Sequence, residues 1–205
     1  MMAKSKAINK PGANESREEA REAVRTLIRW AGDDPDRAGM IETPDRVLRF
    51  YEEFFTGYGA KTEDYTGSIA NDIVYDDFIL VKDIRIASFC EHHLLPATGS
   101  AHIAYIPGGN IAGIGTLARI ASDCARRFTT QEAITTDIAA MMTQAFAPQG
   151  IAIAVSLTHG CMGLRDRTQQ DSAVMTTKFS GLFRDNPDIQ KQFIMLVNAK
   201  HDPAA

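Results

Sequence analysis

The spacing of hydrophobic positions divides the chain into helical and extended segments. Apolar residues recur every three or four positions in five stretches, and this period is typical of amphipathic helices. These stretches are residues 16–31, 43–57, 117–128, 130–146 and 187–197. Short alternating patterns, with a period of two, predict strands. They fall at residues 78–89, 99–106 and 151–159.

Polar residues and prolines mark where several of these elements begin and end. Ser16 with Glu19 forms the pattern of a capping box, which satisfies backbone N–H groups at a helix start. The pairs Thr43-Pro44 and Asn186-Pro187 are also start signals, since proline is tolerated in the first helical turn. The run 32–35, Gly-Asp-Asp-Pro, ends the first helix. The helical boundaries therefore rest on two independent signals, the spacing of apolar residues and the residues that begin or end a helix.

The element order defines the fold class. Two helices are followed by strand, strand, helix, helix and strand, with a last helix near the end of the chain. This order predicts an α+β fold, with antiparallel strands and a helix pair on one face of the sheet. Residues 1–15 are polar and predict a disordered tail, and residues 16–60 form an N-terminal helical region. Residues 58–76 read as a connection into the remaining domain, 61–205.

Composition limits the classes of partner. A net charge of -4 over 205 residues gives no overall basic field for nucleic acid. No apolar stretch approaches the roughly 20 residues of a membrane-spanning helix. The first residues also lack the apolar core of a signal peptide. We therefore expect no nucleic-acid or membrane partner, and a reducing, cytoplasmic location in which the three cysteines stay free.

Cysteine and histidine cluster at two places that flank the predicted helix pair. Cys90 and His93 are three residues apart, on a predicted turn that leaves a strand, and Cys161 follows the strand that ends at His159. Two thiolates and one imidazole match a catalytic zinc site, which keeps its fourth position for water or substrate. We predict a metal site of Cys90, His93 and Cys161, with His159 as a nearby base that is not a ligand. The third cysteine, Cys124, lies on the apolar face of a predicted helix and is expected in the core.

Several separated motifs resemble those of the GTP cyclohydrolase I family, in the same order over about residues 16–199. The motifs are Glu42-Thr43-Pro44-Asp45-Arg46, Cys90-Glu91-His92-His93-Leu94-Leu95-Pro96, Ala101-His102-Ile103-Ala104-Tyr105-Ile106-Pro107, Gln131-Glu132, His159-Gly160-Cys161-Met162 and Gly181-Leu182-Phe183-Arg184. The resemblance implies the tunnelling fold, a strand-strand-helix-helix-strand-strand unit preceded by helices, as the catalytic domain of residues 61–205. It also implies a homo-oligomer, a decamer of two stacked pentameric rings with sites between subunits.

The resemblance further implies a reaction. Zn²⁺, held by Cys90, His93 and Cys161, would activate a water that attacks C8 of the purine of GTP. The imidazole ring opens, C8 leaves as formate, and the ribose rearranges and recloses to give dihydroneopterin triphosphate. His159 and His92 would transfer protons. The remaining implied roles are in substrate binding, with guanine held by Gln131 and Glu132 and phosphates by Arg46, Arg119 and Arg165.

Three segments depart from the family's pattern at residues that hold the triphosphate. The usual Gly-Leu-Ser-Lys is Gly113-Ile114-Gly115-Thr116 here, so a lysine has become Thr116. The stretch after Cys161 carries Asp166 beside Arg165. A later Ser-Lys-Thr reads Ser172-Ala173-Val174, which removes another lysine. Loss of one charged contact to a polyanion costs about 1.5 to 3 kcal/mol.

These departures leave three interpretations open. In the first, the chain acts on GTP with the phosphate site rebuilt from Arg46, Arg119, Arg165 and Arg167. In the second, the same zinc chemistry acts on a purine nucleoside or on a free or oxidised purine base. The third is a zinc-stabilised binding scaffold without activity. The retained Gln131-Glu132 pair favours the first, and the two histidines that are not ligands argue against the third.

Overall fold

The computed structural model describes residues 16–199, apart from the side chain of Arg167. The predicted tail, 1–15, lies outside this range. The described chain forms two compact units, residues 16–60 and 61–199. Among the described residues, no helix has both the length and the apolar character needed to cross a bilayer.

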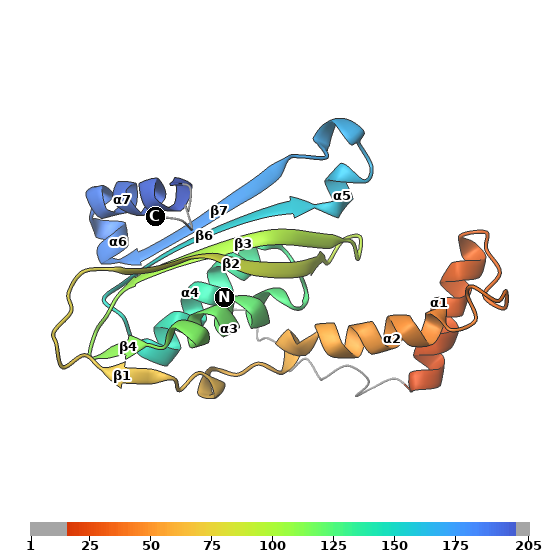
Figure 1. Ribbon diagram of the computed structural model, residues 1–205, viewed down its shortest axis with the longest axis horizontal. Coiled ribbons are helices and arrows are strands. Elements are labelled where there is room, and N and C mark those ends of the chain that lie inside the picture. The colour runs from red at the N-terminus through yellow and green to blue at the C-terminus, as the bar shows by residue number, and fades with distance from the viewer. Residues whose placement is uncertain (1–15, 200–205) are drawn as a thin grey trace, which may run out of the picture. The chain divides into compact units, whose positions relative to one another are not determined.

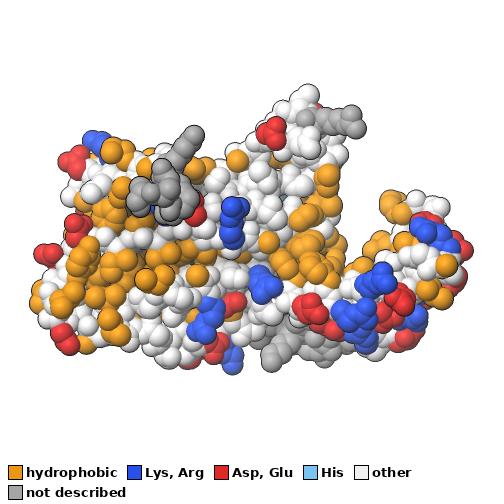
Figure 2. Space-filling view, in the orientation of Figure 1, with side chains coloured by type: hydrophobic (Ala, Val, Ile, Leu, Met, Phe, Trp, Pro, Cys, Tyr) orange, Lys and Arg blue, Asp and Glu red, His pale blue; other side chains and the backbone are white. Residues whose placement is uncertain are grey.

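The first unit contains two helices, α1 (Arg17–Trp30) and α2 (Thr43–Phe54). The capping box predicted for Ser16 and Glu19 is present. Ion pairs tie the helices together, and Arg21 reaches Asp45 at 3.1 Å. Figure 2 shows basic and acidic side chains interspersed over this unit. The predicted apolar stripe of α1 contains no fully buried residue within the described chain, although Ala20, Val24 and Ile28 are half-buried.

The second unit is built on a five-stranded sheet, within residues 61–199, in the order β5-β2-β3-β6-β7. The main strands are antiparallel to their neighbours, whereas the short β5 runs parallel to β2. The strands are β2 (Ile79–Cys90), β3 (Pro96–Ile106), β5 (Phe128–Thr129), β6 (Gly150–His159) and β7 (Ala173–Gly181). A separate antiparallel pair consists of β1 (Ser68–Ala70) and β4 (Asn110–Ala112).

Helices cover both faces of this sheet (Figure 1). The pair α3 (Ile114–Ala125) and α4 (Gln131–Phe146) packs on one face. The short α6 (Leu182–Asp185) and α7 (Pro187–Asn198) lie on the other. One further short helix, α5 (Gly160–Gly163), follows β6 directly. The predicted α+β class, with its helix pair on one face, is confirmed, and the element order is that of the tunnelling fold.

Alternation along β6 explains how one strand serves two cores. Its successive side chains point to opposite faces of the sheet. Ala152 and Ala154 pack with Phe183 and Phe193, on the face that α6 and α7 cover. The larger Ile151, Ile153 and Val155 alternate with these alanines and are also buried. The small residues leave room for aromatic rings on one side, while the branched residues fill the space beneath the helix pair.

Some details differ from the pattern-based expectations. Phe128 was predicted to end a helix but lies in β5, because α3 ends at Ala125 and the chain turns back to pair with β2. The strands β1, β4 and β7 use segments for which no alternation was predicted. The expectation for Cys124 is confirmed, since its side chain is buried in the core. Burial raises the pKa of its thiol to about 12.

Candidate functional site

The turn between β2 and β3 brings Cys90 and His93 together. Cys90 is the last residue of β2, and its backbone N–H donates to the carbonyl of Leu95 at 2.9 Å. Leu94 closes the turn by donating to the carbonyl of Cys90, also at 2.9 Å. Leu94 takes a left-handed conformation, with φ of 54°, which the tight reversal requires. Cys90 Sγ and His93 Nδ1 lie 3.5 Å apart as a result.

The end of β6 delivers the third candidate ligand to the same place. His159, the last residue of β6, pairs with Ala97 of β3, so Cys161 in α5 emerges beside the β2–β3 turn. Figure 1 shows this turn and α5 at the same end of the sheet. Gly160 makes the approach possible, because a Cβ there would lie 2.9 Å from the Pro96 carbonyl oxygen. A side chain at position 160 would therefore push α5 away from β3.

Ligand atoms of Cys90, His93 and Cys161 all lie within 4.8 Å of one another. Two thiolates and an imidazole form a donor set that zinc prefers, at about 2.3 Å for sulfur and 2.0–2.1 Å for nitrogen. Tetrahedral geometry at those lengths places two sulfurs about 3.8 Å apart. Small side-chain movements would satisfy this, so the residues fit a zinc ion with one open coordination position.

The two thiols are electrostatically unequal. Burial acts to raise the pKa of Cys90, but backbone N–H groups of His93 and His92 and the thiol of Cys161 outweigh it, so that pKa is lowered. Burial raises the pKa of Cys161, and the neighbouring charge of Cys90 raises it further. The Cys90 thiol therefore ionises first. A divalent cation would remove the repulsion that opposes the second ionisation.

A pocket of about 220 Å³ opens beside this group. The predicted site residues that line it are Cys90, His92, His93, Gln131, Glu132, His159 and Cys161. Thr129, Thr130, Met162 and Val174 also line it. The sequence reasoning gave these four no role, although Met162 belongs to the His159-Gly160-Cys161-Met162 motif and Thr130 begins the predicted helix of residues 130–146. The structure thus gathers ligands, histidines and the acidic residue around one cavity.

The first turn of α4 contributes Gln131 and Glu132 because β5 pairs with the end of β2. Thr129 lies opposite Cys90 in this pairing, which places the start of α4 beside the ligand group. Glu132 is exposed at the pocket, near the positive end of the helix dipole. The Gln131 side chain is buried, and its Oε1 lies 2.8 Å from His159 Nε2.

The remaining histidines occupy different environments. His92 is exposed, with its Nε2 3.6 Å from a carboxylate oxygen of Glu91. His102, for which no role is expected, is buried in β3 and accepts a hydrogen bond from the backbone N–H of Asp83 at 3.2 Å. Asp83 has a φ of 60° at an irregularity of the β2–β3 pairing. His102 therefore supports the sheet, away from the residues that line the pocket.

Each of the three predicted phosphate-binding arginines has a partner within the chain. Arg165 Nη1 lies 3.3 Å from His93 Nε2. The Arg119 guanidinium stacks 5.0 Å from the centre of the Tyr65 ring and also donates to the Asp64 carbonyl. In the first unit, Arg46 forms an ion pair with Glu42, one helical turn away, at 2.6 Å. The side chain of Arg167, the fourth arginine considered, lies outside the described part of the chain.

Two departures from the family's pattern have defined surroundings. The Asp166 carboxylate accepts hydrogen bonds from the backbone and hydroxyl of Thr168 at 2.9 and 2.7 Å, and these bonds lower its pKa. It is thus engaged in its own loop. Thr116 lies in the first turn of α3. Its hydroxyl is so close to Gly67 that a Cβ added at Gly67 would come within 2.5 Å of it. The hydroxyl therefore packs closely against the Gly67 backbone.

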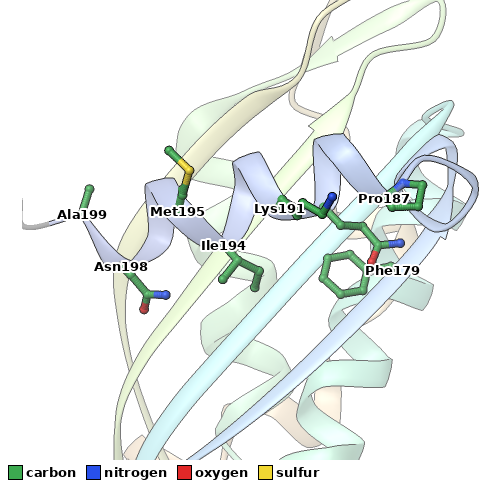
Figure 3. Close-up of a pocket in the computed structure, with 8 residues that line it drawn as sticks. Phe179, Pro187, Lys191, Ile194, Met195, Asn198 and Ala199 are labelled. Atoms are coloured by element: carbon green, nitrogen blue, oxygen red, sulfur yellow. The ribbon is translucent and has the colours of Figure 1, made fainter.

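A second hollow, a groove of about 640 Å³, lies along α7 (Figure 3). It is lined by Phe179, Pro187, Gln190, Lys191, Ile194, Met195, Asn198 and Ala199. Lys191 is the one charged side chain among these described lining residues. The groove contains none of the predicted site residues and offers no group of metal ligands or paired acid and base. The chemistry is therefore expected at the pocket beside Cys90.

Comparison with known proteins identifies a family for this chain. The profile of the family described as GTP cyclohydrolase I matches residues 20–198. Proteins named GTP cyclohydrolase 1 from Brucella canis and Brucella suis biovar 1 are each 44% identical over 189 residues. The match covers 92% of this chain and 87% of each relative. A solved structure of the archaeosine synthase QueF-Like in the apo form is 17% identical, with a TM-score of 0.41, and covers 51% of this chain and 93% of its own.

The relatives define the class of protein as cyclohydrolases, which are hydrolases acting on cyclic amidines. The chain belongs to the GTP cyclohydrolase I family. The resemblance found in the motifs and the predicted enzyme class are thereby confirmed. The roles of individual site residues stay predictions, which the next section develops.

Proposed function

We propose that the protein binds GTP and opens the imidazole ring of its guanine by hydrolysis at C8, releasing formate and forming 7,8-dihydroneopterin triphosphate. One observation carries this proposal: the Cys90, His93 and Cys161 ligand atoms meet within 4.8 Å, at a pocket that His92, Glu132 and His159 also line. Membership of the family supports the same activity.

Cys90, His93 and Cys161 would hold Zn²⁺. When bound, zinc would polarise a water and lower its pKa toward about 7. The chain supplies the orientation of the ligands, through the β2–β3 turn and the close packing of α5 against Pro96. A reducing compartment such as the cytoplasm would keep both cysteines available as thiols.

The histidines and Glu132 would act on the purine. His159 would deliver a proton to the imidazole-ring nitrogen and so make C8 more electrophilic, as a positioned imidazole can do in general acid catalysis. His92, exposed at the pocket, would assist later proton transfers. The exposed Glu132 carboxylate can accept two hydrogen bonds, from guanine N1–H and the 2-amino group.

The phosphate-binding residues are proposed as Arg46, Arg119 and Arg165. Arginine forms charge-assisted, often bidentate, hydrogen bonds with phosphate oxygens. Each of these arginines would have to exchange its present partner for phosphate. That observation favours a second candidate function, in which the same ring opening acts on a purine nucleoside or base without the triphosphate.

A homo-oligomer, expected to be a decamer, would complete the site. Three features of the chain support assembly. Leu27 and Trp30 of α1 are 64% and 87% exposed, and β7 lies at an edge of the sheet, where backbone groups are available for pairing. Figure 2 shows hydrophobic side chains at the end of the second unit where β1 lies, and Ile69, Ile73 and Val74 are exposed there. Ten chains of 22.5 kDa would give roughly 225 kDa, which light scattering after gel filtration would measure.

The test of the activity follows formate release from GTP before and after zinc removal. Dialysis against a chelator should abolish formate release, and stoichiometric zinc should restore it. Formate release that continues at full rate in metal-free protein would contradict the zinc site.

A further inference from the structure

Gln131 is the most completely enclosed polar side chain of the pocket, with 3% of its surface exposed. Its Nε2 lies 2.9 Å from the carbonyl oxygen of Val155 and 2.8 Å from that of Val174. The Thr176 hydroxyl lies 3.2 Å away. An amide nitrogen has two protons to donate, and the two carbonyl oxygens accept both.

This arrangement fixes which way the Gln131 amide points. If the amide were flipped, its oxygen would face two carbonyl oxygens, with no proton between them. The oxygen Oε1 must therefore face His159, where it lies 2.8 Å from Nε2. Because Oε1 can only accept, Nε2 of His159 must carry the proton of that hydrogen bond. In the neutral ring, Nδ1 is then the nitrogen that carries no proton.

We propose that Gln131 is a positioning residue that orients His159 and selects its tautomer, instead of a residue that binds guanine. The proposal rests on the proposed function, in which His159 protonates the purine. In the inferred arrangement, the backbone of β6 and β7 holds the amide, the amide holds the imidazole, and Nδ1 serves the substrate. A partner that fixes the second nitrogen of a catalytic histidine is a general device for setting its tautomer.

The alternative roles of Gln131 give different kinetic results. A residue that contacts guanine in both ground and transition states would change KM when it is removed. A residue that acts through the proton donor would change kcat, with KM nearly constant. If Gln131 only ties α4 to β6 and β7, its substitution would lower the stability of the fold. Substitution of another member of the same hydrogen-bond cluster would then have the same effect.

The test compares Gln131→Met with a matched control, Thr135→Val. Methionine keeps the approximate length of glutamine but removes its hydrogen bonds. The buried Thr135 hydroxyl donates to the backbone carbonyl of Gln131 at 2.8 Å and lies 2.6 Å from the Thr176 hydroxyl. Thr135→Val therefore perturbs the same cluster and spares the bond between the Gln131 side chain and His159. With zinc-loaded proteins and GTP, Gln131→Met should lower kcat about 10- to 100-fold, equivalent to one or two hydrogen bonds. KM should stay within about twofold, and Thr135→Val should stay within about twofold in both constants.

A conservative variant, Gln131→Glu, tests whether restored hydrogen bonds also restore kcat. In Gln131→Glu, a protonated buried carboxyl can donate its O–H to a strand carbonyl and accept from His159 Nε2. This variant should recover most of the kcat that Gln131→Met loses. A raised KM with unchanged kcat in Gln131→Met would overturn the proposal, as would equal loss of kcat in Gln131→Met and Thr135→Val.

The tautomer gives a readout that needs neither turnover nor the methionine variant to fold. Solid-state ¹⁵N spectra of ¹⁵N-histidine protein, with His159→Asn to assign the signal, should show His159 protonated at Nε2. Protonation at Nδ1 alone would overturn the proposal. Wild-type protein that releases no formate from GTP would refute the proposed function, while the spectrum would still decide the role of Gln131.

Discussion

The substitution Cys161→Ser tests whether zinc binding is linked to folding at the Cys90–His93–Cys161 group. It exchanges one thiolate donor for a hydroxyl and leaves the other two in place. In the metal-free protein, burial and the charge of Cys90 raise the pKa of Cys161, so the two thiols resist joint ionisation. Zinc should still bind the folded chain much more strongly than the unfolded chain, because folding brings the three donors together.

The magnitude follows from this difference in affinity. A ligand that binds only the folded state, at 1,000 times its Kd, stabilises that state by about 4.1 kcal/mol. For a chain of this length, about 1 kcal/mol shifts Tm by 2–4 °C, so zinc should raise the Tm of the wild type by roughly 8–16 °C. Loss of residues that merely support a ligand weakens metal binding about 10- to 100-fold, and loss of a ligand should cost at least as much. Taking the upper end of that range, a loss of about 100-fold or more, the variant at the same free zinc should gain at most about 1.4 kcal/mol, or roughly 3–6 °C.

Differential scanning fluorimetry in chelator, and again in buffered zinc, measures both shifts. Cys124→Ala is the matched control, because Cys124 is buried in the core and does not belong to the ligand group. It should lower the baseline Tm and keep the full zinc-induced rise. If Cys161→Ser shows the same rise as the wild type, Cys161 is not a ligand and the proposed site is wrong.

Three further predictions address the proton donor, the fold and the phosphate site. His159→Ala should retain one zinc per chain, by atomic absorption, and lose formate release from GTP; unchanged turnover would reject its proton transfer. Burial lowers the pKa of His102 below its ordinary value of 6.5, so as pH falls through that value the unfolded chain binds a proton first and stability declines. Urea titrations at pH 7.5 and 5.5 should show a smaller decline for His102→Gln, and an equal decline would assign the effect to other groups. Thr116→Lys should lower KM for GTP about 10-fold or more if phosphate contacts limit binding, whereas a higher KM would contradict that reasoning.

Local signals in the sequence predicted most of the fold that positions the site. The Ser16–Glu19 capping box and the Asn186-Pro187 start mark helices that the structure contains at those positions. The alternation along residues 151–159 predicted β6, because one face receives branched residues and the other alanines. By contrast, β7 is an edge strand with a half-exposed pattern, and its pairing with β6 depends on backbone contacts that the side-chain pattern does not encode.

The ligand group and the role of Gln131 differ in how far the sequence could predict them. Cys90 and His93 meet across a turn of four residues, and their spacing together with the second cluster at His159 and Cys161 indicated a shared site. The Gln131 amide depends on carbonyls of Val155 and Val174, which belong to two strands far along the chain. A first-turn glutamine looked like a substrate ligand or a simple helix residue, and only the packing of α4 against those strands distinguishes the role proposed here.

The central claim is hydrolytic ring opening of GTP, and a comparison of substrates tests it most directly. Zinc-loaded protein would be incubated separately with GTP, guanosine, guanine and 8-oxoguanine, with formate and pterin fluorescence followed in each. We expect formate together with a fluorescent pterin from GTP, and little from the other three. Formate from an unphosphorylated purine, with none from GTP, would contradict it and would show that the same fold and ligand group serve a different substrate.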